Sequence, residues 1–206
     1  MKNKIIASIE RLQHQKKQHF LLAVSGGIDS MVMLDFFNKN SQLANISVCY
    51  VDHNYHANSR KMGKIVSRYC NDNNITFIEH SIDSSGIKGN IESQLREKRY
   101  SFLSSACKEV NADYVVTAHH LDDQIETILM KILNSSSFTA MRGIQSLNNS
   151  LFRPMLDITK DEIWKYAEEN NVNYVSDPTN QDTSLTRNFL RKKVIPLLES
   201  IKPRLY

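Results

Sequence analysis

Hydrophobic positions change their spacing repeatedly along the first two thirds of the chain, and each change marks a new element. The predicted strands are short apolar runs, at 20–25, 45–53, 75–80 and 113–120. The predicted helices have apolar residues every three or four positions, at 3–15, 31–40, 59–73, 90–110 and 121–133. Strands that alternate with helices of this length are typical of right-handed crossovers. We therefore expect an α/β fold with a doubly wound, mostly parallel sheet.

The pattern weakens after residue 133. Residues 134–150 are rich in Ser and Asn and have no sustained period, which predicts a loop. A fifth strand is expected to end at Arg153-Pro154, and helical spacing returns at 161–170 and 183–201. The sequence thus predicts a five-stranded, Rossmann-like sheet with a small helical C-terminal extension.

Two local signals mark the late helices. Thr159 and Glu162 have the spacing of a capping box, in which each residue satisfies a backbone N–H of the other. Pro196 lies inside the last helical segment, where its ring removes a backbone donor and predicts a break or kink.

Composition places the chain among folded proteins. Hydrophobic residues make up 41% and charged residues 23%, which excludes a disordered chain. The three cysteines, at 49, 70 and 107, form no C-x-x-C pair, so the sequence indicates no disulfide framework and no zinc or iron–sulfur site. No apolar run approaches the roughly 18 residues of a membrane span, and the N-terminus lacks the apolar core of a signal peptide. We expect a cytoplasmic protein with no membrane anchor.

The net charge of +4 is unevenly distributed. Residues 1–20 carry five basic residues against one acidic, and residues 187–206 carry six against one. The stretch between them holds 15 basic and 20 acidic residues. Basic ends could contact a polyanion, and two solvated helix faces explain the same pattern.

The strongest local motif is S-G-G-I-D-S at residues 25–30, where the first predicted strand meets the next helix. In a doubly wound sheet, this junction lies at the carboxyl edge, where ligands bind. The glycine pair lets the backbone approach an anion, the helix N-terminus adds its dipole, and Ser25 and Ser30 add hydroxyl donors. The motif is neither a Walker A nor a Rossmann fingerprint. It predicts a phosphate site.

A second motif, A-H-H-L-D-D-Q-I-E-T at residues 118–127, joins the fourth predicted strand to its helix. His119, Asp123 and Glu126 are spaced i, i+4 and i+7 and share a helix face, while Asp122 and Glu126 are i, i+4. Carboxylates at this edge could bind Mg²⁺ or an ammonium group.

The first motif resembles the S-G-G-x-D-S loop of the N-type ATP pyrophosphatases, the PP-loop ATPases. Together with Val51-Asp52-His53, the second motif, Arg153-Pro154, Asp177-Pro178-Thr179-Asn180 and Arg187-Asn188 with Arg191, it resembles the tRNA(Ile)-lysidine synthetase family over residues 20–200. That resemblance implies a ligase that adenylates the wobble cytidine of tRNA(Ile) with a CAU anticodon, using ATP and Mg²⁺. Free L-lysine then displaces AMP to give lysidine.

The resemblance also implies roles for individual residues. The catalytic residues are expected to be Asp29, Asp123, Glu126 and Arg96. The ATP-binding residues are expected to be Ser25, Gly26, Gly27, Asp29, Ser30, His53 and His119. The lysine-binding residues are expected to be Asp123, Glu126 and Asp177. The tRNA-binding residues are expected to be Arg99, Tyr100, Arg187, Arg191, Lys192 and Lys193. Asp29 and Asp122 are the expected metal ligands, although the sequence does not separate metal-binding from lysine-binding carboxylates.

Residues 1–150 are accordingly expected to form a PP-loop nucleotide-binding domain, and residues 151–206 a helical extension that completes the catalytic domain. The C-terminal tRNA-binding domains of many family members are expected to be absent. A homodimer is left open. Two alternatives remain: a PP-loop tRNA thiolase, which needs a catalytic cysteine or an iron–sulfur cluster, and a non-catalytic nucleotide- or RNA-binding module of the same fold.

Overall fold

The computed structural model describes residues 1–12, 16–52, 59–82, 91–134, 142–176 and 186–201, without the side chains of residues 91 and 92. Its strands are β1 (Gln18–Ala23), β2 (Ala44–Asp52), β3 (Thr76–Ser81), β4 (Tyr114–Val116), β5 (Leu147–Asn148) and β6 (Leu151–Phe152). They form one sheet in the order β3-β2-β1-β4-β6-β5. All neighbouring strands are parallel except β5 and β6. The predicted α/β fold with a mostly parallel sheet is confirmed.

The sheet has six strands rather than the five expected, because β5 lies within the predicted loop and forms a hairpin with β6, the fifth strand expected before Arg153-Pro154. Leu147 pairs with Phe152, and Asn148 pairs with Leu151. Between them Asn149 has a φ of 52°, in the left-handed region that Asn tolerates better than most residues. Strands of two residues are too short to show an alternating hydrophobic pattern, which is why the sequence did not reveal the extra strand.

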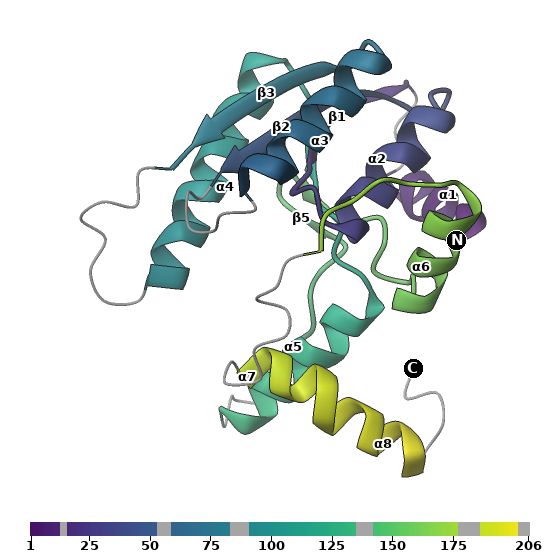
Figure 1. Cartoon of the computed structure of the whole chain (residues 1–206), viewed down its shortest axis with the longest axis vertical. Coiled ribbons are helices and arrows are strands. Elements are labelled where there is room, and N and C mark those ends of the chain that lie inside the picture. The colour runs from purple at the N-terminus through teal and green to yellow at the C-terminus, as the bar shows by residue number, and fades with distance from the viewer. Residues whose placement is uncertain (13–15, 53–58, 83–90, 135–141, 177–185, 202–206) are drawn as a thin grey trace.

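The helices are α1 (Lys2–Glu10), α2 (Ile28–Lys39), α3 (Ser59–Asp72), α4 (Ile91–Glu109), α5 (Leu121–Leu133), α6 (Lys160–Glu169), α7 (Thr186–Phe189), the π-helical turn η3 (Leu190–Val194) and α8 (Ile195–Ile201). None of those described is long and apolar enough to cross a membrane. Figure 1 shows α1, α2 and α6 grouped beside the sheet and α8 running past α5.

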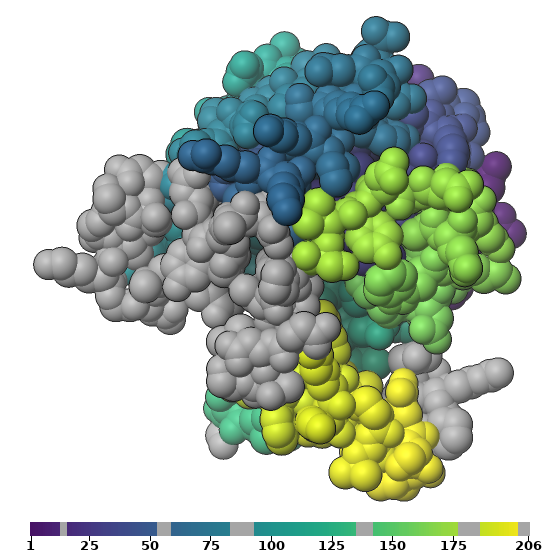
Figure 2. All heavy atoms as spheres, viewed as in Figure 1, coloured from purple at the N-terminus to yellow at the C-terminus, as the bar shows by residue number. Residues whose placement is uncertain are grey.

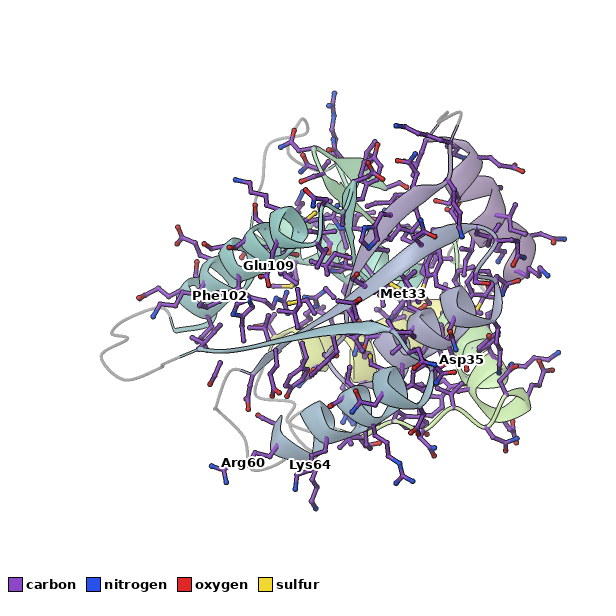
Figure 3. The ribbon with its side chains drawn as sticks, turned by 90° about the horizontal axis from the view of Figure 1, so that it is seen from above. Met33, Asp35, Arg60, Lys64, Phe102 and Glu109 are labelled. Atoms are coloured by element: carbon purple, nitrogen blue, oxygen red, sulfur yellow. The ribbon has the colours of Figure 1, made fainter. Side chains whose placement is uncertain are left out.

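Helices cover both faces of the sheet, because successive side chains of a strand point to opposite faces. Phe20 and Leu22 of β1 lie in a core cluster with residues of α1, α2, α3 and α6. Leu21 lies between them in sequence and belongs to a second cluster with residues of α4. Figure 3 shows Phe102 of α4 and Lys64 of α3 on opposite sides of the strands.

Helix α6 packs against α2, which ties the segment after β6 to the earlier part of the chain. Asp35 of α2 is buried and accepts hydrogen bonds from Tyr69 at 3.0 Å and from Tyr166 of α6 at 2.9 Å. The predicted capping box is confirmed, since the Glu162 N–H donates to Thr159 Oγ1 at 3.2 Å and the Thr159 N–H donates to a Glu162 carboxylate oxygen at 3.0 Å. In Figure 2 the surface of residues 160–176 adjoins that of earlier residues.

The domain division at residue 150 stays a prediction, although β6 continues the main sheet beyond that point. Residues 186–201 are helical, as expected, and the interruption of this segment lies directly before Pro196, where η3 gives way to α8. Proline has no backbone N–H to donate. The π-helical turn interrupts the regular α-helical hydrogen bonds just before Pro196, so the lack of this donor falls where the α-helix is already interrupted.

Candidate functional site

The S-G-G-I-D-S segment forms a compact loop at the end of β1 and the start of α2. Ser30 Oγ lies 3.1 Å from both the backbone nitrogen and the hydroxyl of Ser25, and it donates to the Gly27 carbonyl at 3.0 Å. These hydrogen bonds fold the loop back over the first turn of α2, whose N–H groups have no partner within the helix. The geometry is that of an anion site at a helix N-terminus.

Gly26 is required by its surroundings. Its φ is +83°, and a Cβ atom there would lie 2.8 Å from Cβ of Met62 on α3. Any other residue would be strained by the backbone conformation and would also force α3 away. The first glycine of the pair therefore lets α3 pack directly against the loop.

Asp29 on α2 and the start of α5 meet around the buried ring of His120. His120 Nε2 lies 3.8 Å from Asp29 Oδ1 and 3.7 Å from Asp123 Oδ2. On the other side of the ring, Nδ1 lies 3.7 Å from Asp122 Oδ1. The side chain of His120 is 3% exposed, so three carboxylates surround one buried imidazole. The carboxylates predicted from two separate motifs are thus brought together.

Lys160, at the start of α6, contacts two of these carboxylates. Its ammonium group donates to Asp29 Oδ1, and its backbone N–H donates to Asp122 Oδ1 at 3.1 Å. Burial alone would raise the pKa of Asp122, but the nearby His120 ring and a hydrogen bond from the Lys160 backbone hold it below its ordinary value. Both predicted metal ligands, Asp29 and Asp122, therefore contact the same lysine.

Asp123 and Glu126 form a second charged cluster with two arginines of the C-terminal helical segment. Glu126 is completely buried, and its two oxygens accept hydrogen bonds from Arg187 Nε, at 2.8 Å, and from Arg191 Nε. Asp123 Oδ1 lies 3.5 Å from one terminal nitrogen of each guanidinium. Burial alone would lower the pKa of Arg191, but Glu126 and Asp123 raise it above its ordinary value. Asp123 and Glu126 lie on one face of α5, as predicted. Arg187 and Arg191 of the C-terminal helical segment contact both carboxylates on that face.

The predicted basic turn of α4 surrounds an aromatic ring. The guanidinium carbons of Arg96 and Arg99 lie 5.2 and 5.3 Å from the ring centroid of Tyr100. Nearby, His119 Nδ1 is hydrogen-bonded to the Thr117 hydroxyl at 2.8 Å. Burial, together with the neighbouring arginines and against the effect of Asp123, lowers the pKa of His119 to about 4. His119 is therefore neutral at physiological pH.

The remaining predicted site residues are His53, Asp177, Lys192 and Lys193. His53 and Asp177 lie outside the described residues. Lys193 is exposed on η3, and the neighbouring Lys192 is partly buried.

Sequence reasoning missed three residues that shape the site: Lys160, His120 and Gln124. The side-chain amide of Gln124 pairs with the backbone of Ile144, donating at 2.6 Å and accepting at 2.5 Å, and thereby holds the segment before β5 against α5. Gln124 and His120 lie within the A-H-H-L-D-D-Q motif, so the motif itself was the available signal. No local sequence pattern indicated Lys160, because it is 131 residues from its partner Asp29.

A separate cavity of about 480 Å³ lies beside α3, lined by both acidic and basic side chains that include Asp52, Arg60 and Glu79. Figure 3 shows Arg60 and Lys64 at the outer side of the molecule. None of the predicted site residues that the structure describes lines this cavity, and its mixed charge favours no single ligand.

All three cysteines are buried. Burial raises the pKa of Cys49 and of Cys70 to about 12 and also raises the pKa of Cys107. A thiolate is the reactive form of cysteine, so these environments disfavour nucleophilic chemistry. The described residues also contain no group of three or more His, Cys, Asp or Glu side chains arranged to hold a metal ion.

Comparison with known proteins gives consistent matches. A family model described as a PP-loop domain matches residues 1–198. A tRNA(Ile)-lysidine synthase of Francisella philomiragia is 32% identical over 201 residues, which cover 96% of this chain and 50% of that protein. The Thermotoga maritima tRNA(Ile)-lysidine synthase is 34% identical over 195 residues, covering 92% of this chain and 47% of that protein. The chain spans about half the length of the curated relatives it matches.

Solved structures support the fold. The U34-tRNA thiolase NcsA from Methanococcus maripaludis, with its [4Fe-4S] cluster, superposes with a TM-score of 0.78 at 18% identity, covering 98% of this chain and 74% of that one. An NH3-dependent NAD synthetase from Campylobacter jejuni gives a TM-score of 0.58 at 17% identity, covering 99% of this chain and 83% of that one. At these identities the likeness concerns the architecture alone.

Proposed function

The chain belongs to the PP-loop domain family, and on that premise we propose that it ligates L-lysine to C2 of the wobble cytidine of tRNA(Ile) with a CAU anticodon, at the expense of ATP. The observation that carries the proposal is the position of Asp29. It lies on the phosphate-loop helix and within 3.8 Å of His120, beside the carboxylates of α5. A nucleotide site and a site for a cationic substrate therefore adjoin. Curated lysidine synthases at 32–34% identity add support for this reaction.

In the first step, the cytidine O2 attacks the α-phosphorus of ATP. A P–O bond forms, the bond from the α-phosphorus to the bridging oxygen breaks, and pyrophosphate leaves. Ser25, Gly26, Gly27 and Ser30 hold the departing pyrophosphate with hydroxyl and backbone donors. The S-G-G-I-D-S loop contains no lysine. The Lys160 ammonium beside Asp29 supplies a positive charge next to it.

The donor set at the loop fits Mg²⁺. Asp29 and Asp122 offer carboxylate oxygens, and Mg²⁺ is usually bound by one or two carboxylates together with waters and substrate phosphates. We propose that these two residues hold it. When bound, Mg²⁺ would neutralise charge on the triphosphate.

In the second step, the ε-nitrogen of lysine attacks C2 of the adenylated base. A C–N bond forms, the C2–O2 bond breaks, AMP leaves with that oxygen, and the nitrogen gives up a proton to solvent. We propose Asp123, Glu126 and Asp177 as the carboxylates that bind the amino groups of lysine. Because both oxygens of Glu126 accept from arginines, a direct contact of lysine with Glu126 requires that Arg187 or Arg191 move.

The remaining roles concern the RNA and the nucleotide. We propose that His119 and His53 contact the adenylate and that Arg96 acts in catalysis beside them. Arg99, Tyr100, Lys192 and Lys193 are proposed to contact the tRNA. Arg187 and Arg191 are proposed to contact it from their places beside α5, with part of their charge already matched. The reaction is expected in the cytoplasm, and size-exclusion chromatography with light scattering tests the homodimer.

A thiolase reaction is the competing proposal, because the NcsA structure has the same architecture. The three buried cysteines argue against it. Each lies in a core cluster rather than among the carboxylates around His120, and burial raises the pKa of each.

The test is to incubate the chain with ATP, L-lysine and a tRNA(Ile) transcript and to measure AMP. We expect AMP release that requires both lysine and the transcript. A sulfide donor that replaces lysine would favour the thiolase, and ATP binding without AMP release under any condition would favour a non-catalytic module. Either result would contradict the proposal.

A further inference from the structure

Trp164 of α6 is the only tryptophan of the chain, and it is 45% exposed. Tryptophan is highly buried on average, because its ring is a large apolar surface. The next exposed positions of α6 carry charges, such as those of Lys165 and Glu169, which lie 3.9 Å apart. A single exposed apolar residue needs no explanation by itself, so the surroundings of Trp164 decide what its exposure means.

The indole ring borders a second cavity, of about 410 Å³. Its lining is aromatic and apolar on one side and polar at the rim, and it comprises Trp164, Tyr174, Ala167, Val172, Glu168 and Asn171. The ring centroids of Trp164 and Tyr174 are 5.7 Å apart, with the ring planes at 77°. Glu168 and Asn171 are exposed and offer a carboxylate and an amide. This cavity suits a planar group with an apolar face and a polar edge, and a nucleobase has both.

Two contacts connect the cavity to the candidate site. The Lys160 ammonium lies 5.8 Å from the centroid of the indole ring and also donates to Asp29 on the phosphate-loop helix. The Val175 N–H donates to the Gly26 carbonyl at 3.0 Å, so Tyr174 directly precedes a residue that is fixed to the phosphate loop. Figure 2 shows residues 160–176 at the molecular surface, in light green. The cavity therefore adjoins the site and is open to a large ligand.

We propose that this cavity binds an unpaired base of the RNA substrate, the base of a nucleotide that neighbours the reacting cytidine. The base stacks on the exposed indole of Trp164, and Glu168 and Asn171 make hydrogen bonds with its polar edge. This inference rests on the proposed function, which supplies the RNA. The adenylate is assigned there to His119, whose charged neighbours include arginines of α4, and α4 packs on the opposite face of the sheet from α6.

The emission of the single tryptophan reports on the cavity directly, since a base that stacks on the indole quenches it. The probes are an anticodon stem-loop RNA with a CAU anticodon and two versions of it, each without the base on one side of the wobble cytidine. We expect the complete RNA to quench the emission, with the same affinity that anisotropy of the labelled RNA gives. Removal of one of the two neighbouring bases should abolish the quenching, and saturating ATP should not.

Substitutions separate stacking from an effect on Lys160. Trp164→Ala should weaken RNA binding about tenfold, and the slope of log affinity against log salt should stay unchanged, because the lost ring carries no charge. Trp164→Phe keeps a ring and should recover part of the affinity. Lys165→Ala is the control, because Lys165 is the next residue along α6, is 75% exposed and does not line the cavity, and it should bind RNA as the wild type does.

RNA binding by Trp164→Ala that equals that of the wild type would overturn the proposal. So would quenching that survives both base removals, or quenching that saturating ATP removes, since the adenine would then occupy the cavity. A loss of ATP affinity in Trp164→Ala as large as that in Lys160→Met would also overturn it, because the ring would then only position the lysine. These measurements need no turnover: lysine ligation without quenching would contradict this inference alone, and quenching without ligation would contradict the proposed function alone.

Discussion

Replacing Glu126 with Gln tests whether this carboxylate fastens the C-terminal helical segment to α5. Glu126 is fully buried and accepts hydrogen bonds from Arg187 and Arg191. Gln has nearly the same shape, so the substitution leaves no cavity. It removes the negative charge and turns an amide N–H₂ group toward a guanidinium that can only donate.

The magnitude follows from the burial of each partner. Removing one member of a buried ion pair costs about 3–5 kcal/mol, because the other charge is left uncompensated. Here the arginine side chains are 41% and 38% exposed, so water can solvate them once the carboxylate is gone. We therefore expect a loss of about 2 kcal/mol, or about 6 °C in unfolding temperature for a chain of this size.

Urea unfolding measures the free energy, and hydrogen exchange of residues 186–194 measures the local effect. Exchange should accelerate there and stay unchanged in β1 and β2. Glu169→Gln on α6 is the control, because Glu169 is 60% exposed and lies 3.9 Å from Lys165, and we expect it to change stability by less than about 0.5 kcal/mol. An equally small effect of Glu126→Gln, with unchanged exchange at 186–194, would refute the anchoring role.

Three further substitutions address the nucleotide side of the site and its pH response. Asp29→Ala should abolish ATP consumption and leave the circular dichroism spectrum intact; activity within about threefold of wild type, a barrier change of about 0.65 kcal/mol, would remove Asp29 from the site. Lys160→Met should weaken ATP binding about tenfold in calorimetry, whereas Lys165→Met, at a 75% exposed position, should not; equal affinities would contradict the phosphate role of Lys160. The pKa of His119 is lowered from 6.5 to about 4 in the folded protein, so only the unfolded chain takes up this proton between those values and stability falls as pH decreases through that window. The urea midpoint of His119→Asn should therefore fall less between pH 7 and 5 than that of the wild type, and an equal fall would contradict the shift.

The architecture could be predicted because its signals are local. Each long strand and helix carries its own hydrophobic period, and the capping box at Thr159 and Glu162 marks the start of α6. Strand β5 could not be predicted, because a pair of residues has no period, whereas β6 ends just before Arg153-Pro154 as expected. Strand β4 also ends at Val116, earlier than the apolar run predicts, and residues 117–120 leave the sheet to carry His119 and His120 into the site.

The sequence motifs predicted which residues belong to the site, but they did not predict the ion-pair partners of those residues. The spacing of Asp123 and Glu126 placed them on one helix face, yet their partners Arg187 and Arg191 lie more than 60 residues away in the sequence. Lys160 reaches Asp29 across 131 residues, through the packing of α6 on α2. Such contacts depend on how helices pack, and a single sequence carries no local trace of them.

The proposed activity is tested most directly by mass spectrometry of the RNA product. A tRNA(Ile) transcript with a CAU anticodon is incubated with the chain, ATP and isotope-labelled L-lysine, digested to nucleosides and analysed. We predict that the wobble cytidine gains one lysine with loss of water, carries the isotope label, and forms only when ATP is present. A cytidine of unchanged mass, or a product that carries sulfur in place of lysine, would contradict the account.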